Sequence, residues 1–210
     1  MRLACIAGIV SILISTLGSA QVAQTAIASP LEPQPGAIQK TIDTCTACHG
    51  VNGRSVSPTF PNLAAQSASY LEAQLHAFKN QTRADPDAQA YMWGMASQLN
   101  DGSISALATY FSKQAPAQGV SGHATLIARG KQVYTEGVPA QQITPCVSCH
   151  GSHAEGSGPF PRLAAQHAPY LLKQLLVIQS ALRTAPVMHG IIKDLNREQM
   201  QAVAAYLESI

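Results

Sequence analysis

Two stretches of the chain repeat apolar residues at i, i+3, i+4 and i+7, which is the spacing of one face of an α-helix. The apolar positions are Ile104, Leu107, Ala108 and Phe111 in the first stretch, and Met200, Val203, Ala204 and Leu207 in the second. An asparagine, Asn100 or Asn196, precedes each stretch, and asparagine is a favoured cap for a helix N-terminus. The pattern predicts a final helix in each half, with one buried face.

The same spacing predicts earlier helices. A middle helix follows from Leu71, Leu75 and Phe78, matched by Leu171, Leu175 and Ile178. A helix before residue 135 follows from Leu126, Ile127, Gly130, Val133 and Tyr134. No strand-like alternation of useful length occurs, so the sequence predicts an all-α fold.

The two halves are copies of one unit. Residues 60–75, FPNLAAQSASYLEAQL, match 160–175, FPRLAAQHAPYLLKQL, and 92–111 match 188–207. The stretch SKQAPAQGVSG, residues 112–122, is typical of a linker. We therefore expect a first domain over residues 29–111, a linker over 112–122 and a second domain over 123–210.

The N-terminus is typical of an export signal. Arg2 precedes an apolar run at residues 3–18, and small residues ending at Ala20 or Ala28 offer two cleavage sites. A retained membrane anchor is the alternative, but the run is shorter than the roughly 20 apolar residues that a span needs. We interpret residues 1–28 as a signal peptide and expect a periplasmic protein if the host is bacterial.

Charge excludes one class of partner. The formal net charge is only +2 and no run of Lys or Arg occurs, so the sequence does not indicate a nucleic-acid binder. Hydrophobic residues make up 46% of the chain and charged residues 11%, which indicates a globular protein.

Four of the five cysteines lie in two C-x-x-C-H motifs, CTACH at 45–49 and CVSCH at 146–150. This spacing is typical of covalent haem c attachment: the thiols bind the vinyl groups and the histidine binds the iron. A redox disulfide is the first alternative, but it usually lies on a βαβ framework that this chain lacks. A zinc site is the second, but each motif offers only three ligands. We predict two haems, attached through Cys45 and Cys48 and through Cys146 and Cys149, with His49 and His150 as iron ligands.

The second axial ligand must recur at matching positions in the two copies. Met92 and Met188 do so, each seven residues before a Leu-Asn pair, whereas Met95 is matched by Ile191. Met92 and Met188 are therefore the predicted ligands. Histidine and methionine together raise the reduction potential of a haem relative to two nitrogen ligands.

An axial histidine normally donates its other ring N–H to a fixed acceptor. Pro61 and Pro161 stand twelve and eleven residues after their histidines. We expect their carbonyl groups to be the acceptors, and expect Phe60, Phe160, Leu63 and Leu163 to lie near the haems or in the core.

Taken together, the two C-x-x-C-H motifs, the repeated F-P-x-L-A-x-Q-x-x-x-Y-L segments and the methionine before each final helix resemble the cytochrome c4 family of dihaem cytochromes c. The resemblance covers about Gly36 to the C-terminus. It implies two tandem cytochrome c-like domains, each wrapped around one haem, related by a pseudo-twofold axis and with the propionate edges meeting at the interface.

The resemblance also implies electron transfer from a quinol–cytochrome c reductase or a dehydrogenase to an acceptor such as a terminal oxidase, in some members at the membrane surface. The main hypothesis is therefore a periplasmic electron carrier rather than an enzyme. A peroxidase-like dihaem enzyme and a dedicated haem subunit of a dehydrogenase or oxidase complex are the alternatives.

Overall fold

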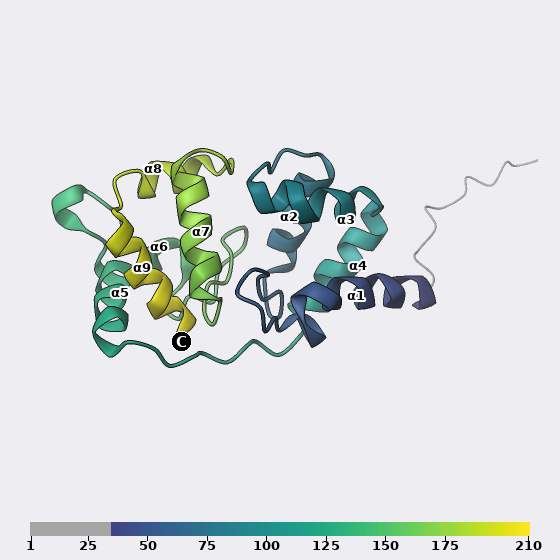
Figure 1. Cartoon of the computed structure of the whole chain (residues 1–210), viewed down its shortest axis with the longest axis horizontal. Coiled ribbons are helices and arrows are strands. Elements are labelled where there is room, and N and C mark those ends of the chain that lie inside the picture. The colour runs from purple at the N-terminus through teal and green to yellow at the C-terminus, as the bar shows by residue number, and fades with distance from the viewer. Residues whose placement is uncertain (1–34) are drawn as a thin grey trace, which may run out of the picture. The chain divides into compact units, whose positions relative to one another are not determined.

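Residues 35–210, which the computed structural model describes, fold into helices joined by loops (Figure 1). Within this range no strand forms, and β-type pairing is limited to two isolated bridges, Val138–Ile143 and Ser157–Phe160. The predicted all-α class is confirmed. The predicted signal peptide lies outside the described residues, and none of the described helices is long and apolar enough to cross a membrane.

The first half contains one long helix that runs through the first cysteine motif. The elements are α1 (Pro35–His49), a 3₁₀ turn η1 (Val51–Gly53), α2 (Ala68–Lys79), a π-helical turn η2 (Ala88–Met92), α3 (Trp93–Ser97) and α4 (Asp101–Ser112). Cys45, Cys48 and His49 form the last turns of α1 itself.

The second half divides the same region into two helices. The elements are α5 (Ala124–Glu136), a 3₁₀ turn η3 (Pro139–Gln141), α6 (Val147–His150), α7 (Ala168–Gln179), α8 (Pro186–Ile192) and α9 (Arg197–Glu208). Helix α5 ends at Gly137, whose φ of 70° lies in the left-handed region. A Cβ there would stand 2.1 Å from the carbonyl oxygen of Ile143, so only glycine allows the chain to turn before the motif.

The final helices begin where the sequence predicts. The side chain of Asn100 accepts the N–H of Ser103 at 2.8 Å, and that of Asn196 accepts the N–H of Gln199 at 2.9 Å. The side-chain oxygen of Gln199 in turn accepts the N–H of Asn196, which completes a capping box. All eight predicted core positions of α4 and α9 are buried.

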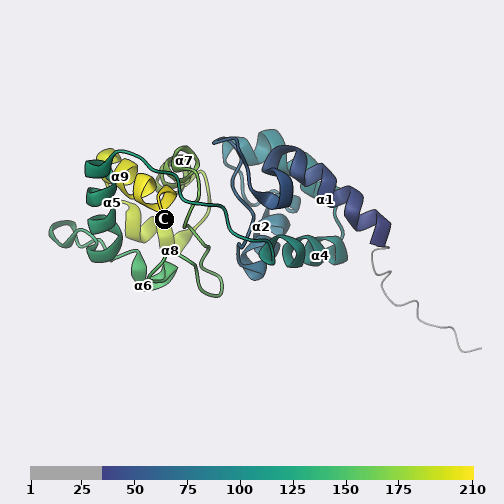
Figure 2. The same ribbon diagram turned by 90° about the horizontal axis from the view of Figure 1, so that it is seen from below.

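Each half has its own apolar core. In the second half α9 crosses α5 closely at Gly130, where an added Cβ would meet the carbonyl oxygen of Ala202 at 1.9 Å. In the first half α4 packs against α2. Residues 113–123 form no helix, and they pass the end of α9, where the N–H of Val120 donates to the carbonyl of Glu208 at 2.9 Å (Figure 2).

Candidate cofactor-binding site

One cavity of about 970 Å³ brings together every site residue that the sequence predicts. The four cysteines, two histidines, two methionines and two prolines that line it are Cys45, Cys48, His49, Pro61, Met92, Cys146, Cys149, His150, Pro161 and Met188. Both halves contribute to its walls, whose surface is mostly apolar and includes leucine, isoleucine, alanine and phenylalanine side chains. The cavity can therefore take large apolar groups beside both cysteine motifs.

The two motif histidines are buried and fixed in orientation. Nδ1 of His49 lies 2.9 Å from the carbonyl oxygen of Pro61, and Nδ1 of His150 lies 3.0 Å from that of Pro161. Since a carbonyl only accepts, each Nδ1 carries the proton and each Nε2 keeps a free lone pair. Burial lowers the pKa of both histidines, and the bond to the proline carbonyl offsets this only in part. A neutral imidazole with a free Nε2 is the form that binds iron.

The aromatic residue before each proline supports the same arrangement. Phe60 meets the ring of His49 edge-on at 6.0 Å between centroids, and Phe160 meets His150 at 6.2 Å. Both phenylalanines line the cavity, as do Leu63 and Leu163. The two halves thus build the histidine surroundings in the same way.

The cysteine environment does not favour a thiol oxidoreductase. Burial raises the pKa of Cys45, and it raises the pKa of Cys146 to about 11. A catalytic C-x-x-C pair needs a thiol whose pKa is lowered, because the thiolate is the nucleophile. The zinc alternative also lacks support, since within residues 35–210 no three His, Cys, Asp or Glu side chains are grouped to hold a metal ion by themselves.

The two methionines reach the cavity from different local structures. Met92 ends the π-helical turn η2, a wide turn that often occurs at functional sites, whereas Met188 lies in α8. Met95 also lines the cavity, but its side chain is 54% exposed and its counterpart is Ile191. Met92 and Met95 both line the cavity, but only Met92 has a methionine at the matching position of the second half.

None of the remaining described histidines lines the cavity. His189, which follows Met188, has Nδ1 3.0 Å from the carbonyl oxygen of Ile178. At the matching position Trp93 donates its indole N–H to the carbonyl of Arg83 at 2.9 Å. These two side chains anchor the segments that carry the methionines.

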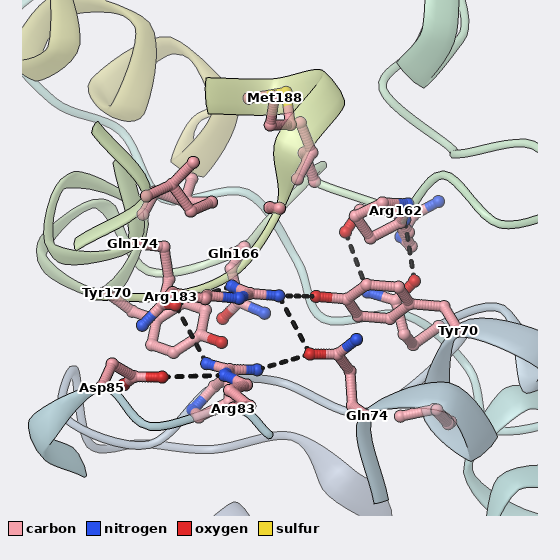
Figure 3. Close-up of a pocket in the computed structure, with 18 of the residues that line it drawn as sticks. Tyr70, Gln74, Arg83, Asp85, Arg162, Gln166, Tyr170, Gln174, Arg183 and Met188 are labelled. Carbon is pink, nitrogen blue, oxygen red and sulfur yellow. Dashed lines mark hydrogen bonds and ion pairs between the residues drawn. The ribbon is translucent and has the colours of Figure 1, made fainter. Parts of the chain in front are cut away.

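Sequence reasoning missed a buried polar network between the two halves (Figure 3). Arg83 donates to Asp85 at 2.9 Å, to Gln74 at 2.8 Å and to Gln174 at 2.9 Å. Arg183 donates to Gln174, Gln74 and the hydroxyl of Tyr70 at 2.6, 3.0 and 2.7 Å. The signal was present, because Arg83 and Arg183 occupy matching positions in RADP and RTAP.

The network places two guanidinium groups where they can bind a ligand that bears carboxylates. Two guanidinium groups, one from Arg83 and one from Arg183, lie on the cavity wall, and only the carboxylate of Asp85 pairs with them in the network. Nε2 of Gln174 and Oδ1 of Asp85 are buried without a hydrogen-bond partner. The two guanidinium groups therefore leave an excess of positive charge beside the cavity. Apolar walls with cationic groups at one side fit haem, whose macrocycle is apolar and whose propionates are anionic.

Comparison with known proteins gives concordant results. The family model for cytochrome c matches residues 37–114 and 127–210. The chain is 41% identical over 190 residues to cytochrome c-552 of Acidithiobacillus ferridurans, covering 90% of this chain and 81% of that protein. It is 33% identical over 177 residues to cytochrome c4 of Azotobacter vinelandii, with 79% and 84% covered.

A solved structure and a further relative add to this. The structure of cytochrome c4 of Acidithiobacillus ferrooxidans matches with a TM-score of 0.76 and 43% identity, covering 80% of this chain and 99% of that one. A protein of Thiomonas intermedia (strain K12) named thiosulfate dehydrogenase electron acceptor is 33% identical over 171 residues, with 78% and 77% covered.

Proposed function

We infer the role of this chain from the premise that it belongs to the cytochrome c4 family of cytochromes c. It carries two covalently bound haem c groups and is an electron carrier. We propose that it works in the bacterial periplasm, between a respiratory donor, either a quinol–cytochrome c reductase or a dehydrogenase, and an acceptor such as a terminal oxidase.

We further propose which residues hold the haems. Cys45 and Cys48 would form the thioether links in the first half, with His49 and Met92 as the axial ligands. Cys146, Cys149, His150 and Met188 would do the same in the second half. The observation that carries this assignment is that both repeated sets line one apolar cavity with the histidine Nδ1 atoms already bound to the Pro61 and Pro161 carbonyls.

What the protein contributes to electron transfer is a rigid and dry surrounding. When bound, haem supplies the one-electron Fe(III)/Fe(II) couple. The chain holds each imidazole in one tautomer and excludes water with its apolar walls, and Arg83 and Arg183 would face the propionates. If His49 with Met92 and His150 with Met188 hold the two irons, neither iron would keep an open position for a substrate, which a peroxidase would require.

Replacing the methionines tests the ligand assignment. The holoprotein should contain two haems by pyridine haemochrome analysis and show the near-infrared charge-transfer band of methionine–iron ligation. Met92→Ala and Met188→Ala should each remove about half of that band and lower the reduction potential of one haem, because methionine ligation raises it.

Met95→Ala is the matched control. Its side chain lines the same cavity but has no methionine counterpart in the second half, so the band should persist in full. Loss of the band in Met95→Ala with retention in Met92→Ala would refute the assignment in the first half. A high-spin signal in the native protein would instead favour a dihaem enzyme.

A second candidate is a dedicated acceptor for one dehydrogenase. The similarity to the thiosulfate dehydrogenase electron acceptor of Thiomonas intermedia favours it, although that protein is less similar than the cytochrome c-552. Both candidates have the same haem ligation and differ in the donor. Stopped-flow reduction by a thiosulfate dehydrogenase, compared with reduction by a quinol–cytochrome c reductase, distinguishes them.

A further inference from the structure

The repeated glutamines of the two AAQ segments, Gln66 and Gln166, cross the interface between the halves. Gln166 accepts the backbone N–H of Asn62 at 2.9 Å and donates Nε2 to the carbonyl of Asn62 at 3.0 Å. Gln66 accepts the N–H of Arg162 at 2.8 Å and donates to its carbonyl at 2.9 Å. Asn62 and Arg162 are matching positions, so each half binds the same backbone site of the other half.

Both glutamines are held firmly. Gln66 is 7% exposed and Gln166 is 6% exposed. The side-chain oxygen of each also accepts the N–H of the residue that follows it, Ser67 at 3.0 Å and His167 at 3.1 Å, where α2 and α7 begin. The acceptor oxygen is therefore fixed by the backbone of its own half while it binds the other half.

The bound N–H belongs to the peptide group that also binds the motif histidine. The peptide that joins Pro61 to Asn62 presents its oxygen to Nδ1 of His49 and its N–H to Gln166. The peptide that joins Pro161 to Arg162 presents its oxygen to His150 and its N–H to Gln66. A continuous hydrogen-bond chain thus runs from each histidine to a glutamine of the opposite half.

Such a chain transmits polarisation. A peptide group is conjugated, so donation by its N–H increases the negative charge on its oxygen. The oxygen then pulls more strongly on the histidine Nδ1–H, which makes Nε2 a stronger donor to a metal. A stronger donor stabilises Fe(III) relative to Fe(II) and lowers the reduction potential.

We propose that Gln66 and Gln166 are positioning residues that set the reduction potential of the haem in the opposite half. Gln166 acts on the haem bound by His49, and Gln66 acts on the haem bound by His150. The proposal rests on the proposed function, since it needs these histidines to be the iron ligands. It makes both potentials depend on how the two halves are docked.

Gln166→Met and Gln66→Met test the proposal in the holoprotein. Methionine keeps the length of the side chain and removes both cross-interface bonds. We expect Gln166→Met to raise the potential of the first-half haem. The Fe(II)/Fe(III) ratio at fixed potential should change about threefold, which is about 28 mV at 59 mV per tenfold for one electron. Gln66→Met should do the same to the second-half haem.

The decisive readout is which half responds. Haem signals in the redox titration are assigned by comparison with Met92→Ala and Met188→Ala, and NMR of ¹⁵N-histidine protein follows Nδ1–H of His49 and His150. Gln166→Met should move the signal of His49 and leave that of His150 in place. A shift in the half that carries the substitution, equal shifts in both halves, or no shift would each overturn the proposal.

Two further variants separate this effect from loss of structure. Gln166→Glu keeps an acceptor for the Asn62 N–H and makes it anionic, so the first-half potential should fall instead of rise. Ser69→Ala removes an interface bond to the Gly158 carbonyl that touches neither histidine peptide, and should leave both potentials unchanged. If NMR shows that His49 and His150 do not bind iron in the unsubstituted protein, the proposed haem ligation is wrong. If both histidines bind iron but neither substitution changes the potential of the opposite haem, only this inference is wrong.

Discussion

At the scale of single residues, Gly130 shows how tightly the second half is packed. Its Cα faces the backbone of α9, and a Cβ would lie 1.9 Å from the carbonyl oxygen of Ala202 and 2.8 Å from Cβ of Tyr206. Because the obstacle is backbone rather than a flexible side chain, the two helices would have to separate.

Gly130→Ala should therefore lower the free energy of unfolding by about 3 kcal/mol, the cost of overpacking a close helix contact. Gly190→Ala in α8 is the matched control: a Cβ there meets nothing within 4 Å. Removing a helical glycine should stabilise the protein by about 0.5–1 kcal/mol. Denaturant unfolding of both holoproteins measures the difference, and equal effects would contradict the packing argument.

At the scale of elements, the cap of α9 depends on a reciprocal pair, Asn196 and Gln199. Asn196→Ala should cost about 1 kcal/mol of stability, because the first turn loses an acceptor for its N–H groups. Asn196→Asp keeps the acceptor and should retain most of the stability in the same unfolding measurement. Equal losses in both variants would show that the cap bond does not stabilise α9.

Local signals account for what the sequence could predict. The starts of α4 and α9 and their buried faces depend on residues within one or two turns of each other, so spacing and capping chemistry suffice. The apolar spacing does not show that α1 continues through the first motif while the second half breaks at Gly137, where a Cβ would meet the carbonyl oxygen of Ile143.

In the candidate site, too, local motifs could be predicted from the sequence and contacts between the halves could not. The C-x-x-C-H motifs and the repeated methionines could be selected from spacing alone, and all of them line the cavity. The bonds of Arg83 to Gln174 and of Arg183 to Tyr70 join residues 91 and 113 positions apart. Matching positions in a repeat identify such residues as candidates, but only the docked halves show that they meet.

At the scale of the whole molecule, Gln66 and Gln166 make matching bonds from each half of the repeat to the other. Removing both cross-interface glutamines leaves the buried backbone N–H of Asn62 without a partner, at about 1–3 kcal/mol, and also removes the partner of the part-buried N–H of Arg162. The halves should then unfold less cooperatively.

The fluorescence of Trp93 reports the unfolding of the first half, because Trp93 is the only tryptophan and lies in that half. In the unsubstituted protein, Trp93 fluorescence and far-UV circular dichroism should give one unfolding midpoint. In the Gln66→Met/Gln166→Met double variant the two midpoints should separate, whereas Ser69→Ala should leave them together. Coincident midpoints in the double variant would show that other contacts couple the halves.

The reciprocal pairing of Gln66 with Arg162 and of Gln166 with Asn62 has the form of a contact between two identical subunits, in which each partner offers the same patch. Such a contact inside one polypeptide is what fusion of a self-associating ancestor would leave behind. The segment at residues 113–123 turns a concentration-dependent encounter into an intramolecular one. Dilution therefore does not part the two metal centres, and the protein always delivers them as a pair.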